Sequence, residues 1–396
     1  MSETNTPAPA AKPAAAGAPD AAATAVAAGT AAAGTSGAGQ LSPEYAALRH
    51  GCGLVDRVAA DRLEMLGADR QRFLNAYVTC EVKGLAAGQG AYGFFTSAQG
   101  RILADVMVLE HGDRLWLELP PGQADAITGH LRKYLIADRV EMRPLGDMVP
   151  LTLAGPGAPE ALAGPAGIAP GLPLPREPWS HARAMVSGIE VTLQRRERLG
   201  VPALTLWVSA SLAASLKEEL LAWSGGAGGG LRPVGPEALE VVRTEAGIPR
   251  YGQDFGPQNF PQETGLDGAV SYTKGCYLGQ EVVARIHYRG GVQKALCGLV
   301  FDGPAVPARG TALLYEGREA GTLGTAVHSP ALDRPAGLAI LHRRAAAPGS
   351  RLELADGGSG EVRALPLAAP APGSSPSPPE GWEGDRGVAG GDPTKR

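Results

Sequence analysis

The two ends of this chain cannot contribute to a hydrophobic core, and this confines folding to the residues between them. Residues 1–40 hold seventeen Ala and only three charged residues, and residues 366–396 are rich in Pro, Gly and Ser. Neither segment has enough large apolar side chains to offset the conformational entropy that folding removes. We therefore predict disordered tails over 1–41 and 367–396, with two or three domains between them.

The charge and hydropathy of the chain exclude several kinds of partner. A net charge of −4 and a pI near 6.0 argue against binding nucleic acid through bulk positive charge. No apolar run reaches the roughly 18–20 residues of a membrane span, and the Ala-rich start lacks the basic flank and the Leu-rich stretch of a signal peptide. We expect a cytoplasmic protein with no membrane association and no strong direct binding to nucleic acid.

The pattern of apolar residues predicts an α+β protein with antiparallel hairpins. Its first part has predicted strands at 62–66, 91–95, 102–109 and 115–119 and predicted helices at 69–78 and 124–135. A second domain is expected to begin near residue 150, with strands at 151–154, 185–193 and 204–208 and a helix at 212–223. The run GGAGGG at 225–230 predicts a linker, and a helix is predicted at 236–246.

The C-terminal part of the folded region has a different sequence pattern. From Lys294 to about Leu365, short apolar runs are separated by Gly or Pro and show almost no helical periodicity. This pattern is typical of a small β-barrel or sandwich.

The spacing of the four cysteines predicts that any reactive thiol acts singly rather than as part of a cysteine cluster. Cys52, Cys80, Cys276 and Cys297 lack the close spacing of a zinc or iron–sulfur cluster site, so we predict no metal site held by this chain. Lys274 precedes Cys276, and a helix is predicted to begin close to it; both features would favour a thiolate. A buried, unreactive thiol fits the same residues equally well.

Several charged residues have both a functional and a structural interpretation. Arg285 lies in a group with His287, Arg289 and Lys294 that can hold a carboxylate or phosphate, although a solvated helix face explains them nearly as well. Arg243 and Glu245 are two apart on a predicted helix, so one of them should point inward and need a partner. Asp105, a carboxylate between apolar neighbours in a strand, is either functional or on a solvated edge.

The chain resembles a known family in the segments that carry these residues. The segments VRTEAGIPRYGQD (242–254), PQE (261–263), KGCYLGQEVVAR (274–285) and HYRGGVQK (287–294) resemble the YgfZ family of folate-binding proteins, which support iron–sulfur protein maturation. That family is related to the T-protein, or aminomethyltransferase, of the glycine cleavage system. Segments 53–82 and 88–109 are similar to the folate-binding domain that both share, and the resemblance spans about 42–345.

The resemblance implies a three-domain, aminomethyltransferase-like ring with a central channel for tetrahydrofolate and a C-terminal β-barrel. The expected domains are 42–150 with 229–292 for folate binding, an inserted α/β domain at 151–228, and the barrel at 293–366. Cys276 and Asp105 would be the working residues, since Asp105 falls at or next to the acidic position that aminomethyltransferases use at the folate. The residues expected to bind the folate are Arg243, Lys274, Gly275, Tyr277, Gly279, Gln280 and Arg285.

One departure from the aminomethyltransferases separates two possible functions. Their second domain carries a loop whose Glu binds the pterin, whereas the equivalent stretch here, Gly200–Trp207, has no carboxylate. The leading hypothesis is therefore a tetrahydrofolate-binding accessory protein for iron–sulfur enzymes or their assembly factors, including enzymes that modify tRNA. The alternative is a tetrahydrofolate-dependent aminomethyltransferase or methyltransferase.

Overall fold

The computed structural model describes residues 42–56, 60–223, 230–289 and 291–373. The tail predicted over 1–41, residues 374–396 of the tail predicted over 367–396, and residues 225–229 of the predicted linker lie outside the described residues. Within the described ranges, no helix combines the length and the apolar character that crossing a bilayer requires.

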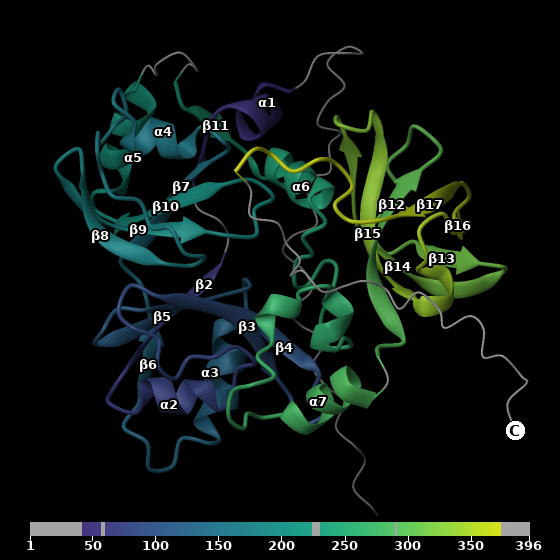
Figure 1. Cartoon of the computed structure of the whole chain (residues 1–396), viewed down its shortest axis with the longest axis horizontal. Helices are drawn as coiled ribbons and strands as arrows, with labels where there is room; N and C mark the ends of the chain where they lie inside the picture. The colour runs from purple at the N-terminus through teal and green to yellow at the C-terminus, as the bar shows by residue number, and fades with distance from the viewer. Residues whose placement is uncertain (1–41, 57–59, 224–229, 290, 374–396) are drawn as a thin grey trace, which may run out of the picture. The chain divides into compact units, whose positions relative to one another are not determined.

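A five-stranded antiparallel sheet, ordered β3-β4-β5-β2-β6, forms the first domain (Figure 1). Its strands are β2 (Asp61–Leu66), β3 (Gly90–Thr96), β4 (Ile102–Glu110), β5 (Arg114–Leu119) and β6 (Glu141–Pro144), and the helices α2 (Arg70–Asn75) and α3 (Ala124–Arg132) cover one face. The helices cover this face because it is apolar: on strand β4, Val106 and Val108 are buried against them. Side chains alternate along a strand, so Asp105 and Met107 point to the opposite face.

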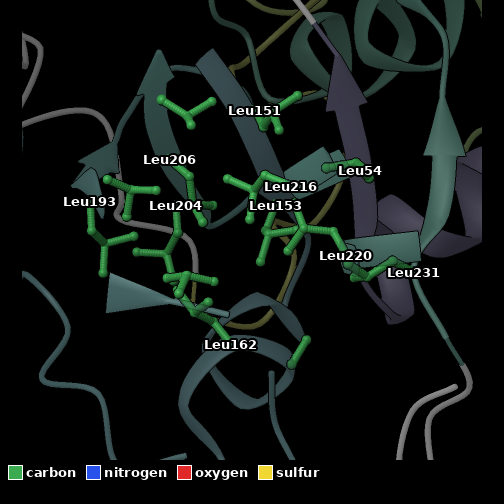
Figure 2. Close-up of a cluster of buried hydrophobic side chains, with 14 of the residues drawn as sticks. Leu54, Leu151, Leu153, Leu162, Leu193, Leu204, Leu206, Leu216, Leu220 and Leu231 are labelled. Carbon is green, nitrogen blue, oxygen red and sulfur yellow. The ribbon is translucent and has the colours of Figure 1, made fainter. Parts of the chain in front are cut away.

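A six-stranded sheet, ordered β11-β1-β7-β10-β9-β8, forms the second domain. Its strands are β1 (Gly53–Asp56), β7 (Met148–Ala154), β8 (His181–Val186), β9 (Ile189–Arg196), β10 (Ala203–Ser209) and β11 (Arg232–Val234). The helices α4 (Ala158–Ala163) and α5 (Ala213–Ala222) pack on it. Figure 2 shows leucines from these strands and helices converging in its core.

One expectation for this region is wrong. The single strand predicted at 185–193 is a β8–β9 hairpin, because Ser187 and Gly188 adopt φ angles of 50° and 76° and form a tight turn. The sequence predicted no strand at 53–56, within the range 42–150, but these residues form β1, which pairs with β7 and β11 in the second sheet.

The C-terminal domain is a closed barrel of six strands, ordered β12-β15-β14-β13-β16-β17, as predicted. The strands are β12 (Lys294–Phe301), β13 (Ala312–Tyr315), β14 (Arg318–Ser329), β15 (Arg334–His342), β16 (Arg351–Leu354) and β17 (Ser359–Arg363), with a short 3-10 helix η3 (Arg343–Ala345) after β15. Pairing of β17 with β12 closes the barrel. Before it come the 3-10 helices η1 (Pro261–Thr264) and η2 (Asp267–Ala269) and the helix α7 (Gln280–Arg289).

Helix α6 (Pro236–Glu245) is buried between the N-terminal helix α1 (Pro43–His50) and the barrel strands β14 and β15. The sequence predicted one inward charge on this helix, but both Arg243 and Glu245 are buried. The Glu245 carboxylate accepts hydrogen bonds from Tyr45 of α1 and from Ser329 of β14. Burial and the nearby carboxylate raise the pKa of Tyr45 well above its usual value, so the phenol remains a donor.

On the opposite side of α6, the Arg243 guanidinium hydrogen-bonds several segments of the chain. Its Nη1 donates to Asp254 at 2.9 Å and to the Ile248 carbonyl at 2.6 Å. Its Nη2 donates to Thr325 of the barrel at 2.6 Å, and Nε and Nη2 both donate to Glu240. Every nitrogen of this guanidinium therefore has a protein acceptor.

The packed chain extends beyond the predicted boundary at 366. The backbone N–H groups of Leu367 and Ala368 donate to the Glu245 carbonyl at 2.8 and 3.2 Å. Ala371 is buried in the cluster that includes α1 and α6. The tail predicted over 367–396 is therefore wrong for these residues, which cover the end of α6.

We predict that Arg243→Ala lowers the free energy of unfolding by about 3–5 kcal/mol, because it leaves the buried Asp254 carboxylate without its cation. Arg351→Ala, which breaks an exposed ion pair with Asp302 on the barrel, is the control and should cost less than about 1 kcal/mol. Urea unfolding curves measure both. Equal, small losses would show that α6 does not depend on this ion pair.

Candidate functional site

Asp105 of β4 lies beside Tyr92 of β3 on the sheet face that α2 and α3 leave uncovered. Tyr92 pairs with Met107, so it is a diagonal neighbour of Asp105 on the same face, and its hydroxyl donates to the Asp105 carboxyl group. Burial raises the pKa of Asp105, while the Arg198 cation and the Tyr92 hydrogen bond act in the opposite direction. The carboxyl group is therefore more easily protonated than an exposed Asp.

Two residues of the second domain contact the Tyr92 ring. The Trp179 ring stacks on it with centroids 5.4 Å apart and planes 15° apart, and the Arg198 guanidinium carbon lies 4.2 Å from its centre. Both residues adopt positive φ angles, 63° and 69°. Bulky residues seldom adopt this backbone conformation, and it recurs at functional sites.

Tyr251, in the segment after α6, completes the cluster. Its hydroxyl donates to the Leu103 carbonyl at 2.6 Å, and burial together with the Asp105 charge raises its pKa. The cluster residues are all partly exposed: Tyr92, Asp105, Trp179, Arg198 and Tyr251. They offer a carboxyl group, a guanidinium and flat aromatic surfaces, which suits a planar ring that carries amino groups and an acidic tail.

The KGCYLGQE segment (274–281) forms a second group of predicted residues, held against the first domain. Lys274 is buried, and its ammonium donates to the carbonyls of Asn75, Val78 and Cys80 at 2.8, 2.9 and 2.5 Å. Burial lowers the pKa of Lys274 to about 8. Its expected role beside the Cys276 thiol is wrong, because the side chain anchors the loop to the carbonyls that follow α2.

The other end of this segment is anchored as well. The Leu278 N–H donates to the Ala76 carbonyl at 2.9 Å, and the Thr96 hydroxyl donates to the Leu278 carbonyl at 2.6 Å. Gly279 has a φ of 86°, and a Cβ there would lie 2.4 Å from the Ser97 carbonyl oxygen. Only glycine fits this close approach.

Cys276 lies between the two anchors and is exposed. The adjacent Gly275 has open space around it, since a Cβ there would contact nothing within 4 Å. Tyr277 turns inward, buried below the Lys274 ammonium, which lies 5.3 Å from its ring centre. Helix α7 begins at Gln280, in agreement with the prediction of a helix close to the thiol.

The remaining predicted ligands have other surroundings. Arg285 is exposed on α7, and Gln280 is partly buried at the start of that helix. Arg243 has no nitrogen left for a ligand, so its expected contact with the folate is replaced by the hydrogen bonds that join α6 to the barrel. In the described part of the chain, no hydrogen bond, ion pair or ring contact links the Cys276 loop with Asp105.

The sequence did not reveal three members of the Asp105 cluster. Trp179 follows a Gly- and Pro-rich connection, and Arg198 lies in the turn between β9 and β10, so both looked like ordinary loop residues. Tyr92 lies in the strand predicted at 91–95, and no functional role was expected for it. Trp179, the one large aromatic residue at the end of that Pro-rich stretch, was the available signal.

Comparisons with known proteins agree with this domain organisation. Residues 35–274 match the family described as the GCVT N-terminal domain, and residues 294–371 match the glycine cleavage T-protein C-terminal barrel domain. A putative chloroplastic transferase of Arabidopsis thaliana is 28% identical over 326 residues, which cover 82% of this chain and 73% of that protein. An aminomethyltransferase of Symbiobacterium thermophilum is 29% identical over 324 residues, which cover 78% and 84%.

The crystal structure of the glycine cleavage system aminomethyltransferase T from Bartonella henselae has a similar fold. It superposes with a TM-score of 0.71 at 21% sequence identity, covering 82% of this chain and 88% of the other. At this identity the likeness concerns the fold alone.

We predict that Cys276 is the first of the four thiols to be alkylated. Burial raises the pKa of Cys52, Cys80 and Cys297 to about 12, so these remain protonated thiols through the whole range from pH 7 to pH 9. Iodoacetamide at pH 8, followed by peptide mass spectrometry, should label Cys276 at least tenfold faster than the others. Equal rates at Cys276 and Cys52, the least buried of the three, would contradict this.

Proposed function

We propose, because the chain belongs to the GCVT family, that it binds a reduced folate at the Asp105 cluster. The observation that carries this proposal is the meeting of Asp105, Tyr92, Trp179 and Arg198, which two different domains bring together. A pterin is a flat ring with amino groups, and a folate ends in a carboxylate tail. The cluster offers a matching partner for each of these parts.

The residues present fit this cofactor through their chemistry. The aromatic faces of Trp179 and Tyr251 suit a planar ring, and the Asp105 carboxyl group can hydrogen-bond ring or amine nitrogens in either protonation state. Arg198 supplies a cation for the tail in place of Arg243. When bound, tetrahydrofolate supplies a carrier for one-carbon units.

We further propose that the exposed Cys276 thiol is the working group and that the protein supports iron–sulfur enzymes or their assembly factors, including those that modify tRNA. The support comes from the KGCYLGQE segment. Its two ends are fixed by Lys274 and Gly279, which leaves the thiol accessible at the apex of the loop. A thiol held in this way can meet a partner protein without rearrangement of the fold.

The second candidate is a folate-dependent aminomethyltransferase, which the names of the relatives favour. One feature counts against it. The stretch Gly200–Trp207, where aminomethyltransferases carry a pterin-binding Glu, runs into the buried strand β10 and offers no carboxylate. The accessory function therefore remains the proposal.

Tetrahydrofolate should bind the purified chain, and Asp105→Asn should weaken binding about tenfold, equivalent to about 1.4 kcal/mol. The substitution keeps the size of the side chain but removes its acidic character. Anaerobic calorimetric titration measures the affinity, with Asp302→Asn on the barrel as the control. Unchanged affinity in Asp105→Asn would place the folate elsewhere in the molecule.

In cells that lack the protein, Cys276→Ser should fail to restore the activity of an iron–sulfur enzyme, whereas Cys52→Ser should restore it. The same purified variants distinguish the two candidate functions. With tetrahydrofolate and an aminomethyl donor, the chain should form no methylene-tetrahydrofolate. Catalytic formation that persists in Cys276→Ser would instead support the aminomethyltransferase.

A further inference from the structure

A cavity of about 430 Å³ lies between the β4–β5 hairpin of the first sheet and strands β7 to β10 of the second. Trp116 and His111 line it from the hairpin, and Trp207 lines it from β10. Its lining includes neither Asp105 nor Cys276. The cavity is therefore separate from the folate site proposed at the Asp105 cluster.

The apolar part of the lining combines aromatic rings with aliphatic side chains. The rings of Trp116 and Trp207 are 5.8 Å apart and inclined at 62°, and Met148 and Val191 add aliphatic surface. Leu212, another lining residue, is 43% exposed, which places it toward the mouth. A wall of this kind favours a small planar ring, because rings pack well against indole edges and faces.

Two buried nitrogen atoms of the lining residues have no hydrogen-bond partner among the described residues: Nε1 of Trp116 and Nε2 of His111. The two rings adjoin, with centroids 4.0 Å apart. An indole N–H can only donate, and a buried donor without an acceptor is unfavourable. Both residues line the cavity, so a molecule bound there would lie next to these two rings.

The lining carries no net charge. Its ionised residues are Arg114 and Arg183 against Asp113 and Glu190. Arg114 already pairs with Asp113 and with Glu64, and Arg183 lies 3.7 Å from Glu190. Burial, followed by the proximity of His181, lowers the pKa of His111 to about 3, so its imidazole is neutral at pH 7.

We propose that this cavity binds a small, uncharged, planar heteroaromatic molecule of the nucleobase type. The ring would pack against Trp116 and Trp207, a ring nitrogen or carbonyl oxygen would accept from the Trp116 N–H, and the His111 imidazole would pair with a second polar edge atom. An aliphatic ligand would leave both nitrogen atoms unsatisfied. An ionised ligand would find no free counter-charge.

Calorimetric titration of the full chain with adenine and with uracil at pH 7.5 tests the proposal. At least one of these probes should bind saturably with one site per chain, and benzoate, a flat but charged ring, should bind at least tenfold more weakly. Trp116→Phe keeps an aromatic ring and removes the N–H, so it should weaken binding at least fivefold. Trp223→Phe is the matched control, because its indole donates to the Ala166 carbonyl away from the cavity.

A second variant covers the case in which Trp116→Phe does not fold. Leu212→Glu changes an exposed residue and should also weaken binding, since it adds a charge beside the ring. Absence of saturable binding for both probes would overturn the proposal. A folded Trp116→Phe variant, or Leu212→Glu, that binds the probe as tightly as the wild type would also overturn it. Tighter binding of benzoate than of both probes would do the same.

Discussion

Two opposite charges on the buried helix α6 join the parts of this molecule. Arg243 and Glu245 are only two residues apart, so they point in different directions, and each must find its hydrogen-bond partners in a different place. The Glu245 carboxylate receives Tyr45 from the N-terminal helix and Ser329 from the barrel. Arg243 binds Asp254 and Thr325. A helix with a single apolar stripe could not connect so many segments with comparable specificity.

In the KGCYLGQE loop, most residues hold the loop in place and few are available for chemistry. Lys274 satisfies three backbone carbonyls, Gly279 allows close contact with the Ser97 carbonyl, and Tyr277 packs inward. These residues hold the loop in place. Gly275, Cys276 and Glu281 are the exposed residues of this segment, so a motif of many polar residues presents a single thiol.

Local pattern was sufficient to predict a C-terminal β-barrel or sandwich, strands β2 to β5 of the first sheet and the helix at 236–246, because each depends on apolar residues close in sequence. It did not predict the short strand β6. It failed for contacts between distant segments. Trp179 and Arg198 reach Tyr92 from another domain, and Lys274 reaches the end of α2 across about two hundred positions. The sequence identified Arg243 as a charge that needs a partner, but it could not show that the partners are protein atoms rather than a ligand.

The position of strand β1 has a consequence for the order of events during synthesis. Residues Gly53–Asp56 leave the ribosome early, yet their partners β7 and β11 lie at Met148–Ala154 and Arg232–Val234. The five-stranded sheet lies between them in sequence, and its strands pair only with one another. It can therefore form first, while the backbone N–H and C=O groups of β1 stay unpaired until β7 and β11 have been synthesised. Completion of the second sheet thus marks the moment at which most of the chain has emerged.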